Sequence, residues 1–184
     1  MALKTIDQML DDFDKWRKQH PEYGTSLELL RSIADESPRG MVLVVAAELE
    51  RILLLAIKGL LRSGKGLENL DKDKQGPIST LSAKINLSHA LGIIDDVELR
   101  DLHLIRQIRN DFAHSTSVSF LTAAVVSRVN ELSQSTPAYQ PVENLENNAV
   151  HLVMIIGAAA LGAEKTELPR IERVFGPEQG MVDG

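Results

Sequence analysis

The chain has no cysteine, and aromatic residues make up only 4% of its 184 positions. The absence of thiols excludes disulfides and cysteine-ligated metal centres, and it fits a reducing compartment. Because aromatics are scarce, leucine, isoleucine, valine and alanine supply most of the 43% hydrophobic content. Such a composition favours helices that pack through small and aliphatic side chains. We therefore predict an all-α protein.

The chain also lacks a hydrophobic run long enough to cross a bilayer. The most apolar stretch, residues 149–163, is interrupted by His151 and falls short of the roughly 20 residues that a transmembrane helix needs. Residues 1–5 begin no apolar segment of the kind that signal peptides contain. We accordingly expect no membrane association and a cytoplasmic location.

Excess positive charge is missing as well. The formal net charge is −6, so any contact with nucleic acid requires a local basic patch rather than the overall field of the molecule. One candidate patch consists of Arg100, Arg106, Arg109 and Arg128, and a second consists of Lys58, Arg62 and Lys65. A helix-turn-helix could be drawn across residues 79–114, but its second helix would begin with acidic residues, which repel phosphate. We reject a DNA-reading helix there.

Capping residues and prolines divide the chain into about seven helices. Capping boxes begin at Thr5 and Thr25, and Pro21 and Pro38 are expected to end the two short helices that precede them. Further helices are expected over residues 40–62, 79–91, 95–114, 119–132 and 144–167. We predict a single helical bundle domain over residues 1–168 and a flexible C-terminal tail over residues 169–184.

Two glycine- and aspartate-rich patterns imitate ligand-binding loops. The glycines from Gly59 to Gly66 resemble a phosphate-binding loop but lack the preceding strand and the final hydroxyl residue, so we interpret them as a helix C-cap followed by a loop over residues 64–77. The segment after Asp71 imitates a calcium loop but has Ser82 where a glutamate is required. The histidines show no metal-ligand spacing. We expect no metal and no cofactor.

The expected helix over residues 95–114 has two distinct faces. At about 100° per residue, one face is apolar, and it contains Leu102, Leu104, Ile105, Ile108 and Phe112. The opposite strip contains His103, Gln107, Asn110 and His114, with Arg106 beside it. Surface helices more often carry lysine and glutamate in such a strip. We therefore select His103, Arg106 and Gln107 as candidate binding residues.

The end of this helix combines a permanent cation, an amide and a titratable imidazole in Arg109, Asn110 and His114. A guanidinium can pair two phosphate oxygens, and an imidazole can move a proton near neutral pH. Arg109 and His114 converge only if the helix ends or loosens near Phe112. The alternative is structural: Arg109 forms a buried ion pair with Glu48 or Glu50, and His114 interacts with the helix dipole.

A long segment of the chain resembles a known family. The residues concerned are Gly76-Pro77-Ile-Ser-Thr-Leu81-Ser82-Ala-Lys84-Ile-Asn-Leu87, then Ala90-Leu91-Gly92-Ile-Ile-Asp95, Glu98 and Leu104-Ile-Arg-Gln-Ile-Arg109-Asn110. They are similar to the mannitol operon repressor family over roughly residues 40–135. The resemblance implies an all-helical, cytoplasmic transcriptional regulator without a helix-turn-helix. It would act as a homodimer that binds a partner protein or nucleic acid, either DNA or RNA.

A shorter resemblance points to a different mechanism. The segment from Arg109 to His114 looks like the R-x(4–6)-H motif of HEPN domains, small helical bundles that often act as metal-independent ribonucleases. By this resemblance Arg109, Asn110 and His114 would be the catalytic set, duplicated across a two-fold dimer. RNA supplies its own 2′-hydroxyl nucleophile, so a base, a phosphate clamp and a proton donor suffice. A helical scaffold whose polar strip is only an interface is the third interpretation.

Overall fold

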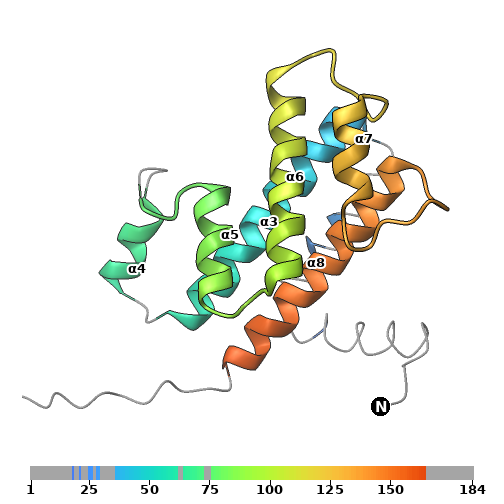
Figure 1. The fold of residues 1–184 in the computed structure, drawn as a ribbon. Coiled ribbons are helices and arrows are strands. Elements are labelled where there is room, and N and C mark those ends of the chain that lie inside the picture. The colour runs from blue at the N-terminus through green and yellow to red at the C-terminus, as the bar shows by residue number, and fades with distance from the viewer. Residues whose placement is uncertain are drawn as a thin grey trace, which may run out of the picture.

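The computed structural model describes residues 36–61, 64–72 and 76–164, with residues 18, 21, 25, 26, 28 and 29, and it describes only the backbone of residues 161–164. This part of the chain contains helices and no strand (Figure 1). The helices are α3 (Pro38–Leu60), α4 (Lys65–Leu70), α5 (Leu81–Ala90), α6 (Asp96–His114), α7 (Ala123–Asn130) and α8 (Pro141–Glu164). The predicted all-α fold is confirmed.

Helix α3 is the central element of the bundle. It packs against α8, α6 and α5, and it crosses behind α5 and α6 in Figure 1. Its apolar residues face several neighbours at once, so that Val42, Val45, Ile52 and Ile57 are fully buried. This explains why its sequence is apolar on nearly every side.

The two helices that flank α3 complete the core. Helix α6 contributes Leu102, Ile105, Ile108 and Phe112, as its predicted apolar face requires, and α8 contributes Leu145, Leu152, Val153 and Ile156. None of the helices that the structure describes combines the length and the apolar character needed to traverse a membrane. The predicted tail over residues 169–184 lies outside the described residues.

The start of α6 follows its sequence closely. The Asp95 side chain accepts hydrogen bonds from the backbone N–H groups of Val97 and Glu98, and the Glu98 carboxylate accepts from the backbone N–H of Asp95. This reciprocal capping box was predicted. The helix continues to His114, and the N–H of Ser115 then donates to the carbonyl of Asp111 over 3.1 Å.

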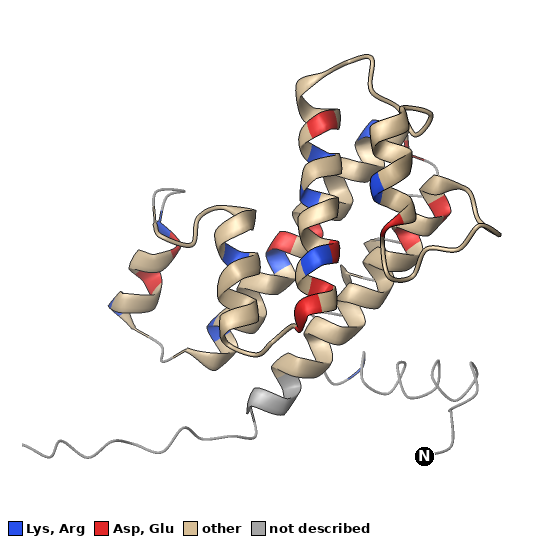
Figure 2. Ribbon diagram, in the orientation of Figure 1, with Lys and Arg blue, Asp and Glu red and all other residues tan. Residues whose placement is uncertain are grey.

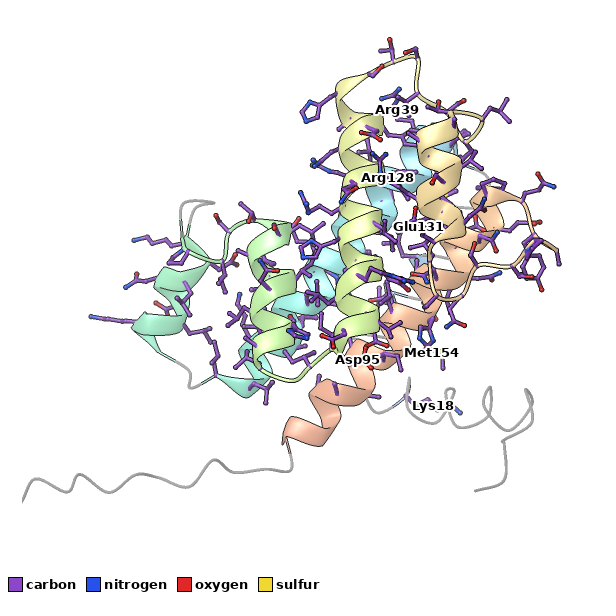
Figure 3. All side chains as sticks on the ribbon, viewed as in Figure 1. Lys18, Arg39, Asp95, Arg128, Glu131 and Met154 are labelled. Carbon is purple, nitrogen blue, oxygen red and sulfur yellow. The ribbon has the colours of Figure 1, made fainter. Side chains whose placement is uncertain are left out.

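The start of α3 differs from the prediction. The helix begins at Pro38, two residues before the expected start at residue 40, and the Ser37 hydroxyl accepts a hydrogen bond from the N–H of Gly40 over 3.1 Å. Proline is favoured there because the first turn of a helix has no intrahelical partner for its N–H groups. The expected end of the preceding helix lies outside the described residues. Arg39, in the first turn of α3, donates to the carbonyl of Ser115 over 2.7 Å, and its guanidinium lies over the ring of Phe112. Figure 3 shows Arg39 beside the C-terminal end of α6.

The segment expected to be a loop over residues 64–77 contains the short helix α4. Gly64 has a φ of +135° and begins α4, so the interpretation of this glycine as part of a C-cap was wrong. Gly76 passes so close to the carbonyl of Leu70 that a Cβ would lie 2.1 Å from its oxygen. Only glycine permits that approach, which turns the chain back toward α5.

A buried carboxylate connects α6, α8 and the turn after α7. Asp101 has no exposed surface. Its oxygens accept hydrogen bonds from the backbone N–H of Ser133, at 3.2 and 3.0 Å, and from the side-chain amide of Asn148, at 2.9 Å. A charge this deep is tolerated because several donors replace the water that it has lost.

Replacing Asp101 with alanine should destabilise the bundle because it leaves the donors of Ser133 and Asn148 without an acceptor. We expect the free energy of unfolding to fall by about 2 to 4 kcal/mol and the melting temperature by roughly 5 to 15 °C. The control is Asp96→Ala, which removes a carboxylate of the same helix whose side chain is 93% exposed, and it should cost less than about 1 kcal/mol. Equal losses in urea denaturation of the two variants would contradict the role given to Asp101.

Candidate functional site

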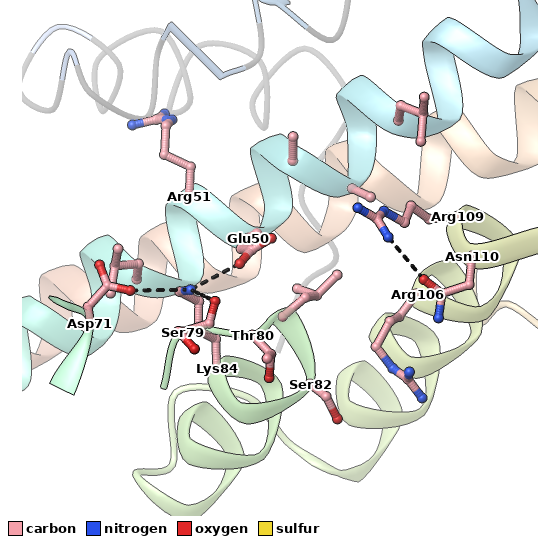
Figure 4. Close-up of a pocket in the computed structure, with 15 residues that line it drawn as sticks. Glu50, Arg51, Asp71, Ser79, Thr80, Ser82, Lys84, Arg106, Arg109 and Asn110 are labelled. Atoms are coloured by element: carbon pink, nitrogen blue, oxygen red, sulfur yellow. Dashed lines mark hydrogen bonds and ion pairs between the residues drawn. The ribbon is translucent and has the colours of Figure 1, made fainter. Parts of the chain in front are cut away.

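An open groove of about 1100 Å³ lies where α3, α5 and α6 meet (Figure 4). Its apolar lining comes from Leu43, Ala46, Ala47 and Leu54 of α3 and from Leu81 of α5. The two alanines leave space that larger side chains would fill. Polar and charged residues gather at two places along this lining, one around Lys84 and the other on α6.

The first polar group centres on a buried lysine. The Lys84 side chain is only 5% exposed, and its ammonium donates to the carboxylate of Glu50 over 3.0 Å and to the carbonyl of Ser79 over 3.2 Å. A carboxylate oxygen of Asp71 lies 3.5 Å away. These contacts join α3, the end of α4 and the start of α5, because each supplies one oxygen to the same cation.

The second polar group consists of Arg106, Arg109 and Asn110 on α6. The guanidinium of Arg109 donates to the side-chain oxygen of Asn110 over 3.1 Å. The Nε of Arg106 is buried and has no hydrogen-bond partner in the described part of the chain. Among the described residues no carboxylate lies within 4 Å of either guanidinium. Arg51, Arg100 and Arg128, by contrast, each have a carboxylate oxygen within that distance.

The structural alternative proposed for Arg109 is wrong, because both glutamates have other partners. Glu48 is held by two hydrogen-bonding nitrogens of Arg51, at distances of 2.7 to 3.1 Å. Burial by itself would raise the pKa of Glu48, but the hydrogen bonds from Arg51 and Ser26 hold it below its ordinary value. Glu50 pairs with Lys84, and Arg109 itself is exposed.

His114 lies outside the groove that contains Arg109 and Asn110. It is the last residue of α6 and is exposed. Because α6 has no break before it, Arg109 and His114 point roughly 140° apart around the helix. Within one chain the structure therefore brings together two of the three residues that the HEPN-like motif selects.

The other candidate binding residues divide between two neighbours. His103 lies within 3.1 Å of the side-chain oxygen of Asn86 on α5. Burial, and to a lesser extent the charge of Arg106, lowers the pKa of His103, which favours the neutral imidazole. Gln107 accepts a hydrogen bond from Arg128 over 3.1 Å and therefore faces α7. Of the three candidates, only Arg106 lines the groove.

The residues of the two predicted basic patches interact with different neighbours. Arg128 forms an ion pair with Asp111, and Arg100 donates to the carbonyl of Glu131 over 2.6 Å. Figure 2 shows basic and acidic residues interleaved on α6 and its surroundings. In the second patch the ammonium of Lys58 lies 3.7 Å from Asp71, and Arg62 lies outside the described residues. Neither set forms one continuous basic surface among the described residues.

The cluster of Lys84 with Glu50 and Asp71 was not predicted from the sequence. A signal was available, because Lys84 lies beside Ile85 and one turn before Ser88 on the face of α5 that becomes buried. A lysine on such a face needs an acidic partner. The sequence did not indicate which of the many acidic residues would supply it.

No protein-family model matches this chain, and no curated protein matches it. Among solved structures, a chain of the X-ray structure of the MtlR–HPr complex from Escherichia coli has a similar fold, with a TM-score of 0.52. The similarity covers 79% of this chain and 99% of that chain, at 19% sequence identity. At this identity the likeness establishes a shared fold. It agrees with the all-helical architecture implied by the resemblance to mannitol operon repressors.

The influence of Arg106 on His103 can be measured directly. Replacing Arg106 with glutamine should raise the pKa of His103, because a neighbouring positive charge no longer opposes protonation. The pKa should stay below its ordinary value, since burial is the larger cause. NMR titration of the imidazole Cε1–H gives the measurement, with Arg100→Gln as the control of equal charge. An unchanged or lowered pKa in Arg106→Gln would contradict this assignment.

Proposed function

We propose that this chain is a bacterial transcriptional regulator of the mannitol-repressor type that acts by binding a partner protein. The supporting observation is the fold likeness to a chain of the MtlR–HPr complex, which extends over 99% of that chain. MtlR is the mannitol operon repressor, and in that structure it is in complex with another protein. A protein related to HPr is therefore the partner to test first.

The charge distribution favours a protein partner over direct DNA binding. The chain carries a net charge of −6, and α6 begins with the exposed acidic residues Asp95 and Asp96. Arg100 and Arg128, which a DNA-binding patch would need, already interact with Glu131 and Asp111. A phosphate backbone would have to compete with these contacts, whereas a protein surface can complement acidic and basic groups separately.

The test is isothermal titration of the purified chain with HPr from the same organism. We expect saturable binding with a dissociation constant in the micromolar range or tighter, which corresponds to about −8 kcal/mol or more favourable. A control protein of similar size and charge should give no signal at the same ionic strength. Absence of HPr binding, together with salt-dependent binding of a promoter fragment, would replace this mechanism with direct DNA contact.

A second candidate is a metal-independent endoribonuclease of the HEPN type. The observation that favours it is the hydrogen-bonded pair of Arg109 and Asn110 in an open groove, with the exposed imidazole of His114 near the same end of α6. In this proposal Arg109 stabilises charge on the phosphate oxygens, Asn110 orients the phosphate or the histidine, and His114 acts as general acid or base. A homodimer is required, since one chain leaves His114 outside the groove.

Ribonuclease activity can be tested with labelled RNA in the presence of EDTA. If the proposal holds, the wild-type chain cleaves RNA, and His114→Ala lowers the rate by about 100-fold or more because a proton-transfer group is lost. His89→Ala is the matched control, since His89 is on α5 and interacts with Asp96. An inactive wild type, or a His114→Ala variant as active as His89→Ala, would exclude this mechanism.

A further inference from the structure

We propose that the groove between α3, α5 and α6 binds the N-terminal segment, residues 5–17, of a second copy of this chain. Two copies exchange these segments reciprocally, so that each segment fills the groove of the other copy. The inference depends on neither the regulatory nor the ribonuclease proposal. It assigns an occupant to an apolar surface that is open in the described part of the chain.

The floor of the groove is a face of α3 with the spacing of a helix–helix contact. The lining positions 43, 47, 50 and 54 follow one another at intervals of four, three and four residues. This spacing places side chains in one row along a helix, against which a second helix can pack. Leu43 and Leu54 are only partly buried, and Ala47 is exposed. The row is therefore an apolar surface suited to another helix.

The middle of this row is built for close approach. Ala46 and Ala47 lie between the larger side chains of Leu43 and Leu54. Packed helices have their axes about 8 to 10 Å apart, and the shorter distances require small side chains at the contact. An incoming helix with bulky apolar residues at its centre would fill the space that the two alanines leave.

The N-terminal sequence has the complementary pattern. Residues 1–17 lie outside the described residues, and a capping box begins at Thr5. At about 100° per residue, the apolar residues that follow fall on one side of a helix, and they are Ile6, Met9, Leu10, Phe13 and Trp16. A helix from Ile6 to Trp16 is about 15 Å long, and the row from Leu43 to Leu54 is about 17 Å long. The two stripes match in length and in character.

The charges at the edge of the segment also match the groove. Asp7 and Asp14 are seven residues apart and lie together at one edge of the expected apolar stripe. On the α6 wall of the groove, Arg109 is exposed and has no carboxylate partner in the described part of the chain. An acidic edge of the incoming helix can lie along this wall, which favours one orientation of the segment.

Two observations select this segment and place it on a second copy. The C-terminal residues 165–184 offer no helix of this length, because Pro169 and Pro177 interrupt them. Figure 3 shows Lys18 at the α8 side of the bundle, and α5, which forms one wall of the groove, lies at the opposite side. Trp16 precedes Lys18 by two residues, a reach of about 7 Å. The segment of one chain therefore starts away from the groove of that chain.

Disulfide cross-linking of full-length chains tests the contact. Because the chain has no cysteine, each introduced thiol is unique. Leu10→Cys and Ala47→Cys, on differently tagged chains, are mixed and oxidised mildly. Both positions lie in the middle of their stripes, so they meet whichever way the helix runs. We expect a disulfide-linked heterodimer, at about tenfold or more the yield obtained with Ser117→Cys in place of Ala47→Cys, because docking concentrates the two thiols. Ser117 is exposed and lies outside the groove.

A second measurement uses the fluorescence of Trp16, the only tryptophan of the chain. Ala47→Arg places a bulky charged side chain in the middle of the row. It should raise the dissociation constant of the dimer by about tenfold or more, and the emission of Trp16 should move to longer wavelength as the indole becomes exposed. Arginine is a good helix former, so the variant should fold. Ala124→Arg is the matched control, since Ala124 is an exposed alanine on α7, and it should change neither quantity.

Three results would overturn the proposal. The first is a yield of heterodimer no higher than that of the Ser117→Cys control. The second is a cross-link within a single chain that carries both Leu10→Cys and Ala47→Cys, without one in the mixture, which would assign the groove to the segment of the same chain. The third is an equal change of dissociation constant and emission in Ala47→Arg and Ala124→Arg. None of these results bears on HPr binding, so the two proposals fail or stand separately.

Discussion

The candidate site depends on how the acidic residues of the central helix are paired. Glu48 is held by Arg51 on one side of α3, and Glu50 is held by the buried ammonium of Lys84 on the other. Because both carboxylates are engaged, α3 offers no acidic partner to the arginines of α6 across the groove. The Lys84 contact also joins α3 to α5 and to Asp71 at the end of α4, and it leaves Arg106 and Arg109 without a carboxylate partner among the described residues.

Elements governed by local rules could be predicted from the sequence. The capping box of Asp95 and Glu98, the apolar face of α6 and the extent of that helix to His114 all follow from residues within a few turns of one another. The central helix was expected from Gly40 and begins at Pro38, because a proline that marks the end of one segment can also occupy the first turn of the next. Helix α4 was missed because its six residues carry no periodic apolar pattern.

The site itself could be predicted only in part, because it depends on contacts between distant residues. The sequence predicted that Arg106, Arg109 and Asn110 lie on one helix, and all three line the groove. The sequence did not show that Gln107 would lie apart from them. Gln107 faces Arg128, and this contact depends on where α7 packs. The partners of Arg109 and Lys84 were equally hidden: acidic residues are numerous in this chain, and only the packing of α3 decides which of them lies within reach.

The regular geometry of α6 determines which of its side chains can act together within one chain. A regular helix turns by about 100° per residue, so residues five apart diverge by roughly 140° and residues three apart by only about 60°. Arg106 and Arg109 therefore both line the groove of a single chain. Arg109 and His114 diverge because Ser115 ends the helix only after the histidine. The ribonuclease proposal uses both side chains, and it therefore requires a second subunit to bring His114 of one chain to the groove of the other.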